Sequence, residues 1–322
     1  ACRPLQRLLD AGAITERPDV EMLVALARAG VTTLDAAGYA ALERCGLFAP
    51  GTRWSAGEIV APDGTRTRAD LADPRQVTAL PQAANVLWMA GQKFGTSGDP
   101  VGTWTHNVVA SVHAAEHYAG SRIVCFSTGN VYGRSAVSRG GSQEGDTLQP
   151  DGEYAASTIG RERVFESVTR RTGSPLLLYR LFYACDLRYG VVTEIARKGL
   201  HGEPIDLGTG WVNVIWQGDA NRLALRALTV ASAPATALNV TGPMLRVREI
   251  AERCALHAGV SARFAGRESD EALVANVHRL GDELPFTALP LETLCAWAVD
   301  WLRAKGRVLD KPTKFEVRDG RF

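Results

Sequence analysis

The strongest constraint on the fold is an apolar run at residues 123–133 that ends in hydroxyl and glycine residues, IVCFSTGNVYG. An apolar run of this length, bounded by such residues, indicates a buried strand. A predicted helix follows at residues 157–171, with Tyr154 at its start. A hydroxyl at the carboxyl end of a strand and a phenol on the next helix can meet in the crevice where open α/β sheets bind ligands. We therefore predict that this crevice is the active site.

The rest of the chain alternates between apolar runs and segments with helical spacing. Further strands are expected at residues 31–34, 85–91, 176–182, 211–216 and 237–240. Further helices are expected at residues 104–118, 191–198, 219–228, 247–258 and 291–305. Weaker strand candidates lie at residues 53–55 and 58–60, and residues 92–103 are predicted to form a loop. The alternation predicts an α/β fold with a doubly wound, Rossmann-like parallel sheet.

The spacing of the apolar residues changes near residue 185, which predicts two parts. Residues 1–185 are expected to form the Rossmann-like core, with residues 1–30 as a helical lead-in. Residues 186–322 are expected to form a smaller C-terminal substrate lobe. The two parts are predicted to be partly interleaved, because residues 211–228 are expected to return to the core.

Composition and charge narrow the class of partner. The 322 residues are 46% hydrophobic and 22% charged, which is ordinary for a globular protein. The formal net charge of +1 predicts no binding of nucleic acid or of an anionic membrane, and the apolar runs are too short to span a bilayer. Six scattered cysteines without a Cys-x-x-Cys pair favour a reducing cytoplasm over a zinc site or a disulfide frame. The histidines have no metal-ligand spacing with carboxylates, so no metal site is predicted.

Several short motifs follow one another in a set order along nearly the whole chain. They are ADLAD at 69–73, WMAG at 88–91, Asn107, FSTGNVYG at 126–133, YAAS at 154–157, YRLF at 179–182, VNVIWQGD at 212–219 and LNVTGP at 238–243. In this order and spacing they resemble the extended short-chain dehydrogenase/reductase family, of the NAD-dependent epimerase/dehydratase type. The resemblance implies an NAD(P) cofactor, a small-molecule substrate and a homodimer formed through helices such as 104–118 and 157–171. The apolar faces of these helices equally suit packing against their own sheet.

The chemistry of that family uses a serine or threonine, a tyrosine and a lysine four residues after the tyrosine. The resemblance implies that Tyr154 exchanges a proton with the substrate and that Thr128 is the hydroxyl, with Ser127 beside it as a further catalytic candidate. Thr158 stands at the lysine position and carries no charge. A free phenol titrates near ~10, so Tyr154 is expected to be a weak base and a neutral donor. The alternatives are a tyrosine with a structural hydrogen bond and hydroxyls that cap turn amides.

Lys93 follows the strand predicted at 85–91 and is a candidate for the missing cation. The alternative for Lys93 is an exposed loop lysine, since most lysines are exposed.

The predicted cofactor site departs from the family pattern at its glycine-rich loop. The best match to G-x-x-G-x-x-G is Asp35-x-x-Gly38-x-x-Ala41, in which Asp35 brings a negative charge to the place of a diphosphate. The resemblance also implies cofactor contacts at four further positions, which equally suit turn and packing roles. These positions are Asp70 and Leu71 for adenine, and Ala90 and Gly91 for the phosphates and nicotinamide.

The predicted substrate contacts are Asn130, Tyr183, Arg188 and Trp216, with core packing as the alternative for the tryptophan.

Two main hypotheses for the function follow, and a third is less favoured. The first hypothesis is an enzyme on this scaffold that has left redox chemistry behind, with NAD(P) binding weakened or lost. It uses Tyr154 and Thr128 for an isomerisation, elimination or cyclisation of a carbonyl or hydroxyl compound. The second is an ordinary NAD(P)-dependent epimerase, dehydratase or reductase. The third is a non-catalytic protein that binds a small molecule.

Overall fold

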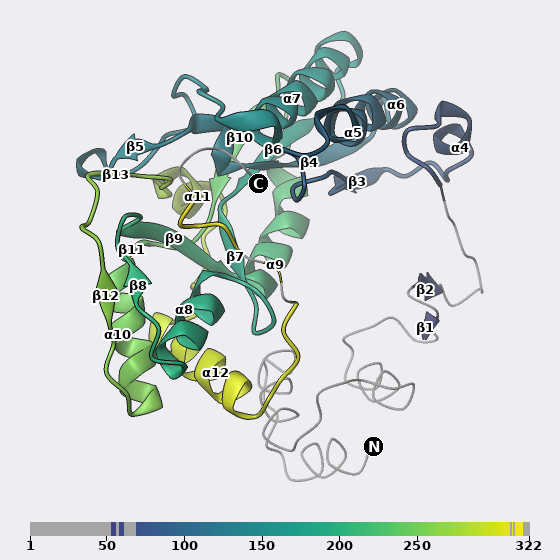
Figure 1. Cartoon of the computed structure of the whole chain (residues 1–322). Helices are drawn as coiled ribbons and strands as arrows, with labels where there is room; N and C mark the ends of the chain where they lie inside the picture. Colours follow the sequence, from purple (N-terminus) through teal and green to yellow (C-terminus); the bar gives the residue numbers. More distant parts are fainter. Residues whose placement is uncertain (1–52, 56–57, 61–68, 310, 312, 318–322) are drawn as a thin grey trace.

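The computed structural model describes residues 53–55, 58–60, 69–309, 311 and 313–317 (Figure 1). The predicted lead-in helices, the strand at 31–34, and the loop with Asp35 and Gly38 lie outside the described residues. Strands β1 (Arg53–Ser55) and β2 (Glu58–Val60) pair antiparallel, so both weak strand candidates are confirmed.

The core of the molecule is a parallel sheet of four strands. Its order is β10 (Thr236–Val240), β6 (Leu176–Leu181), β4 (Arg122–Thr128) and β3 (Asn85–Trp88). Successive residues of β4 point to opposite faces, as the period of two requires. Ile123 and Cys125 pack in one apolar cluster and Val124 packs in another. Both faces are therefore buried, and the predicted doubly wound α/β fold is confirmed.

Helices cover the two faces of this sheet. One face is packed by α6 (Ala110–His117) and α7 (Gly152–Thr172), and the other by α9 (Gln217–Ala227) and α11 (His278–Glu283). Figure 1 shows α5, α6 and α7 over the main sheet, on the side away from α8, α10 and α12. The short helix α4 (Pro74–Thr78) packs beside α6.

The helix predicted at 104–118 begins earlier than its apolar spacing indicates. Helix α5 (Pro100–Trp104) precedes it and continues through a π-helical turn, η1 (Thr105–Val109), into α6. The predicted loop at 92–103 is therefore wrong for its last four residues. Asp99 caps the helix by accepting from Gly102 N at 2.8 Å, and Pro100 occupies the first turn, where its missing N–H is harmless.

A second part of the chain packs around a mixed sheet. This sheet has the order β11 (Met244–Arg246), β9 (Trp211–Trp216) and β7 (Tyr183–Cys185). Its apolar cluster joins it to three helices, α8 (Val191–Leu200), α10 (Val247–Ala258) and α12 (Leu291–Arg303). Strand β9 belongs to this sheet, whereas α9, which follows it, packs on the main sheet.

Several short elements complete the fold. The two-residue strands pair as β8 (Ile205–Asp206) with β12 (Phe264–Ala265), and β5 (Ser135–Ala136) with β13 (Glu271–Ala272). Single 3₁₀ turns are η2 (Gly129–Tyr132), η3 (Val137–Arg139) and η4 (Leu228–Val230). Among the described helices none is both long and apolar enough to cross a membrane. The described residues also contain no cluster of three or more His, Cys, Asp or Glu side chains that could hold a metal ion.

Candidate active site

A cavity of about 400 Å³ lies where β4 and β6 end, at the junction of the two parts of the molecule. Its walls come from the segment after β3, the end of β4, the first turn of α7, the loop between β7 and α8, and the C-terminal segment. The predicted site residues that line it are Lys93, Ser127, Thr128, Asn130, Tyr154, Tyr183 and Arg188. The structure thus brings most of the predicted catalytic and substrate residues together.

Thr128 ends β4 and caps the turn η2 that follows it. Its Oγ1 accepts two hydrogen bonds from Asn130, one from the backbone N at 3.3 Å and one from Nδ2 at 3.0 Å. A hydroxyl oxygen has two lone pairs and one proton. Because both lone pairs are occupied, Thr128 has only its proton left to offer.

Tyr154 lies in the first turn of α7, and its phenol is hydrogen-bonded to the Thr128 side chain. Since both lone pairs of Thr128 accept from Asn130, its hydroxyl donates to the phenol oxygen of Tyr154, which lines the cavity. Burial raises the pKa of Tyr154, whereas the bond from Thr128 and the charge of Arg161 act in the opposite direction. Tyr154 is therefore a neutral donor at neutral pH.

Thr158 is at the position where the family resemblance implies a lysine. Its Oγ1 donates to the Tyr154 carbonyl at 2.8 Å within α7, and the residue is 1% exposed. The hydroxyl is therefore used inside the helix and supplies no charge to the cavity. At this position the chain therefore lacks the lysine that the family resemblance implies for holding the nicotinamide ribose.

Ser127 lines the cavity, but its hydroxyl is committed elsewhere. Its Oγ donates at 2.5 Å to Oε1 of Glu162, which is fully buried. The same carboxylate receives two bonds from Arg180, at 2.9 Å and 2.8 Å. The Ser127 hydroxyl therefore helps to hold this buried ion pair in place, and its catalytic role stays a prediction.

Lys93 is a half-buried member of the cavity wall and not an exposed loop lysine. Its Nζ lies 5.5 Å from the ring centroid of Phe94. Burial lowers the pKa of Lys93 to about 8. The ammonium is therefore mostly charged at neutral pH and loses its proton in the mildly alkaline range.

The four described residues predicted to contact a cofactor do not line this cavity. Asp70 is exposed, and its Oδ1 accepts from Ala72 N at 2.9 Å, which makes it a turn residue. Leu71 and Ala90 are half-buried against the apolar cluster of α6 and α7. A Cβ on Gly91 would lie 2.0 Å from the Nη2 of Arg161, so a larger residue there would displace the guanidinium.

The predicted substrate residues divide into two groups. Asn130, Tyr183 and Arg188 line the cavity, and burial raises the pKa of Tyr183. Arg188 pairs with Asp186 through Nε at 3.0 Å and Nη2 at 2.5 Å. Trp216 does not line it.

The position of Trp216 favours the core-packing alternative, and its contact with a substrate stays a prediction. The residue is 5% exposed, and its ring lies 6.2 Å from that of Trp297. It belongs to the apolar cluster of the second part of the chain.

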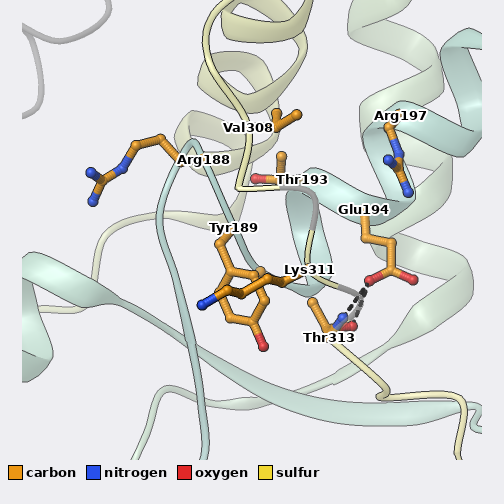
Figure 2. Close-up of a pocket in the computed structure, with 9 residues that line it drawn as sticks. Arg188, Tyr189, Thr193, Glu194, Arg197, Val308, Lys311 and Thr313 are labelled. Atoms are coloured by element: carbon orange, nitrogen blue, oxygen red, sulfur yellow. Dashed lines mark hydrogen bonds between the residues drawn. The ribbon is translucent and has the colours of Figure 1, made fainter. Parts of the chain in front are cut away.

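The C-terminal segment closes one side of the cavity. Leu309 and Thr313 are part of its wall, and Leu309 N donates to the Arg188 carbonyl at 3.0 Å. Figure 2 shows a smaller neighbouring pocket, of about 170 Å³, in which Lys311 extends across Tyr189. There Glu194 accepts bonds from the backbone and hydroxyl of Thr313, at 3.0 Å and 2.6 Å.

Sequence reasoning missed Arg161, which belongs to the polar network behind the cavity. Asn107 holds the segment after β3, because its Oδ1 accepts from Gln92 N at 2.7 Å and its Nδ2 donates to Gln92 O at 2.9 Å. The same Nδ2 donates to Ser157 Oγ at 2.9 Å, and Oδ1 accepts from Arg161 at 2.6 Å. The sequence feature that could have identified Arg161 is its spacing from Tyr154, because it follows Tyr154 by two helical turns on the same face of the helix.

A sequence profile described as the NAD dependent epimerase/dehydratase family matches residues 26–240. A search of curated proteins found no match.

Solved structures share the fold at low identity. MoeE5 in complex with UDP-glucose and NAD is 22% identical, over 74% of this chain and 85% of that chain, with a TM-score of 0.60. RMD from Pseudomonas aeruginosa complexed with NADPH is 19% identical, over 73% and 87%, with a TM-score of 0.62. A UDP-glucose 4-epimerase from Thermotoga maritima with UDP-glucose is 17% identical, over 74% and 84%, with a TM-score of 0.61.

Proposed function

Since this chain belongs to the NAD-dependent epimerase/dehydratase family, we propose that it is an enzyme whose Tyr154 and Thr128 act on an oxygen of a small carbonyl or hydroxyl compound. The proposed step is an isomerisation, elimination or cyclisation without net redox change. Tyr154 donates its proton, or a hydrogen bond, to that oxygen, and general acid catalysis of this kind contributes about 10²–10⁴-fold.

The observation that carries this proposal is that the Thr128 hydroxyl and the Tyr154 phenol line one cavity and are hydrogen-bonded to each other. Asn130 donates twice to the Thr128 oxygen, so Thr128 donates to the phenol oxygen of Tyr154, which is the proton donor of the proposed step. A donor of this kind assists the departure of a hydroxyl or polarises a carbonyl. Burial raises the pKa of Tyr154, which keeps the proton on the phenol until it is needed.

The residue at the lysine position supports a reaction without hydride transfer. Thr158 is bound to the Tyr154 carbonyl and does not reach out of the helix. The chain's residues therefore bind, orient and protonate the substrate, and no step is assigned to a dinucleotide.

The second candidate is an ordinary NAD(P)-dependent epimerase, dehydratase or reductase. It is favoured by the family assignment and by the solved structures of the same fold that contain NAD or NADPH. In this case the chain would have to hold the nicotinamide ribose without the family's lysine.

Calorimetry on the purified chain separates the two candidates. We expect no measurable binding of NAD⁺, NADH, NADP⁺ or NADPH to the parent, and a gain of binding in Thr158→Lys. Tight binding by the parent would overturn the redox-free proposal in favour of the second candidate.

Turnover is then tested without added dinucleotide on UDP-glucose and UDP-glucuronic acid, the sugars named with structures of this fold. Tyr154→Phe is the matched variant, because it removes only the phenol oxygen. Conversion that persists in Tyr154→Phe would contradict the role of the phenol. Binding without any conversion would favour the non-catalytic alternative.

We also propose that the chain forms a homodimer through the helical face outside the main sheet. The large apolar side chains exposed on α5, η1 and α6 are Val101, Trp104, Val109 and Val112. Exposed apolar residues gathered on neighbouring turns are typical of an interaction surface.

A further inference from the structure

Arg161 is a buried cation whose hydrogen-bond partners carry no charge. It is 5% exposed, and it donates from Nη2 to Asn107 Oδ1 at 2.6 Å, from Nε to the Asn107 carbonyl at 3.3 Å, and from Nη1 to the Phe126 carbonyl at 2.9 Å. Within the part of the chain that the structure describes, no carboxylate lies within ion-pair distance of it. The other buried arginine of the region, Arg180, has the Glu162 carboxylate as its partner at 2.8 Å. Burying a cation among neutral groups is costly, so a nearby site of negative charge would explain its place.

The guanidinium of Arg161 lies on the side of α7 that carries Tyr154. Residues seven apart fall on one face of a helix, and helical side chains lean toward the N-terminus. The amide of Asn107 fixes the position of the guanidinium along α7, because it binds both the guanidinium and Ser157 Oγ. The charge is therefore placed beside the helical turn that contains Thr158, one turn from Tyr154. Gly91 leaves the space for it, because any Cβ there would meet Nη2.

We propose that Arg161 is the cation that stabilises negative charge on the phenol oxygen of Tyr154, from within α7 and not from the lysine position. The catalytic meaning of this assignment rests on the function proposed above. In that step the O–H bond of Tyr154 breaks, the proton bonds to the substrate oxygen, and the electron pair stays on the phenol oxygen. Arg161 does not touch the substrate, so it is a positioning residue that acts through Tyr154.

None of the other charged groups described around Tyr154 can replace the charge of Arg161 at every pH. The titratable and charged residues that line the same cavity are Lys93, Asp186, Arg188, Tyr183 and Tyr189. Burial lowers the pKa of Lys93 to about 8, so its charge is lost in the alkaline range. Arg188 is bound to Asp186. A guanidinium stays protonated throughout, and the charge of Arg161 lowers the pKa of Tyr154 against the effect of burial.

A titration of the phenol itself tests the proposal. A fluorotyrosine placed at position 154 is more acidic than tyrosine, and its ionisation is followed by ¹⁹F NMR while the protein stays folded. In Arg161→Met we expect the pKa of this residue to rise by about one unit, as for a charge several ångströms away in a partly shielded site. Arg163→Met is the matched control, because Arg163 is on the same helix but exposed and paired with Glu166. It should leave the titration unchanged.

Two further variants separate charge from packing. Arg161→Lys keeps the charge, and Thr158→Lys in the Arg161→Met background returns a charge to the same helical face. Both should bring the titration back toward that of the parent. The proposal is overturned if Arg161→Met shifts the titration no more than Arg163→Met, or if Arg161→Lys shifts it as far as Arg161→Met.

The titration needs neither turnover nor a cofactor. A dinucleotide found on the parent would refute the redox-free function and leave this result standing. If Arg161→Met does not fold, a parent-like titration in Arg161→Lys supports the proposal, and a shifted one overturns it.

Discussion

The hydroxyl of Thr128 controls how readily Tyr154 gives up its proton. Thr128→Val keeps the shape of the side chain and removes the donor to the phenol oxygen. Because that bond stabilises the phenolate, its loss should raise the pKa of Tyr154 by about one to two units and reduce turnover by a factor on the order of 10². Titration of the phenol and a kcat measurement on the same samples check this. Thr128→Ser retains the hydroxyl, and a serine variant as impaired as the valine one would contradict the role assigned to the bond.

Lys93 makes stability depend on pH, because burial lowers its pKa from 10.5 to about 8. Between these values the unfolded chain binds more protons than the folded one, so the free energy of unfolding rises with pH. The penalty for burying the ammonium is complete below pH 8 and disappears above pH 10.5. We expect a gain of about 2 kcal/mol across this window relative to Lys93→Met. Urea unfolding at several pH values measures it, and parallel curves for parent and variant would refute the assignment.

At the scale of elements, α7 carries an ion pair that fixes it to the main sheet. Glu162 is fully buried and binds Arg180 of β6 through both oxygens, and it also accepts from Ser127 of β4. Glu162→Ala leaves the arginine charge buried without a partner, which should cost about 3–5 kcal/mol of unfolding free energy. Glu166→Ala, on the same helix, breaks an exposed pair with Arg163 and should cost less than about 1 kcal/mol. Urea unfolding compares the two, and equal losses would show that the buried pair does not fix the helix.

The elements were more predictable than their functional details. Helix α10 has the predicted bounds, and the apolar runs gave the strands of the main sheet to within a few residues, because burial on both faces leaves a long apolar signal. The start of α5 was missed because it depends on a cap at Asp99 and not on apolar spacing. The π-helical turn η1 carries no sequence signal that we used.

The candidate site was predictable where chain direction alone decides it. Thr128 and Tyr154 both line the cavity, because the end of a strand and the start of the next helix lie at the same edge of the sheet. The hydrogen-bond partner of each polar atom was not predictable. Ser127 and Thr128 are neighbours on one strand, yet the pleat turns the Ser127 hydroxyl toward Glu162 and leaves Thr128 to meet Tyr154. Arg161 was missed for the same reason, since its role depends on Asn107, 54 residues earlier.

At the scale of the whole molecule, the family assignment confirms the resemblance seen in the sequence, while the boundary near residue 185 and the dimer stay predictions. The molecule leaves one helical face with several large apolar side chains. Trp104, Val109 and Val112 are 41%, 42% and 39% exposed, and they lie on consecutive turns of the same helical run. The Trp104 Nε1 donates to Glu153 at 2.6 Å, which fixes its ring beside α7. The face is therefore ordered and apolar before any partner binds.

We expect this face to hold two copies of the chain together, and charge placed in its middle should separate them. Val109→Glu with Val112→Glu buries unpaired like charges in a symmetric interface, which should weaken dimerisation by about 10²-fold or more. Light scattering after size-exclusion chromatography should find a dimer for the parent and a monomer for the variant. Leu256→Lys is the matched control, because Leu256 is an apolar residue on α10 that is 77% exposed. It should remain dimeric, whereas a monomeric parent, or a dimer that survives both charges, would show that this helical face does not form the interface.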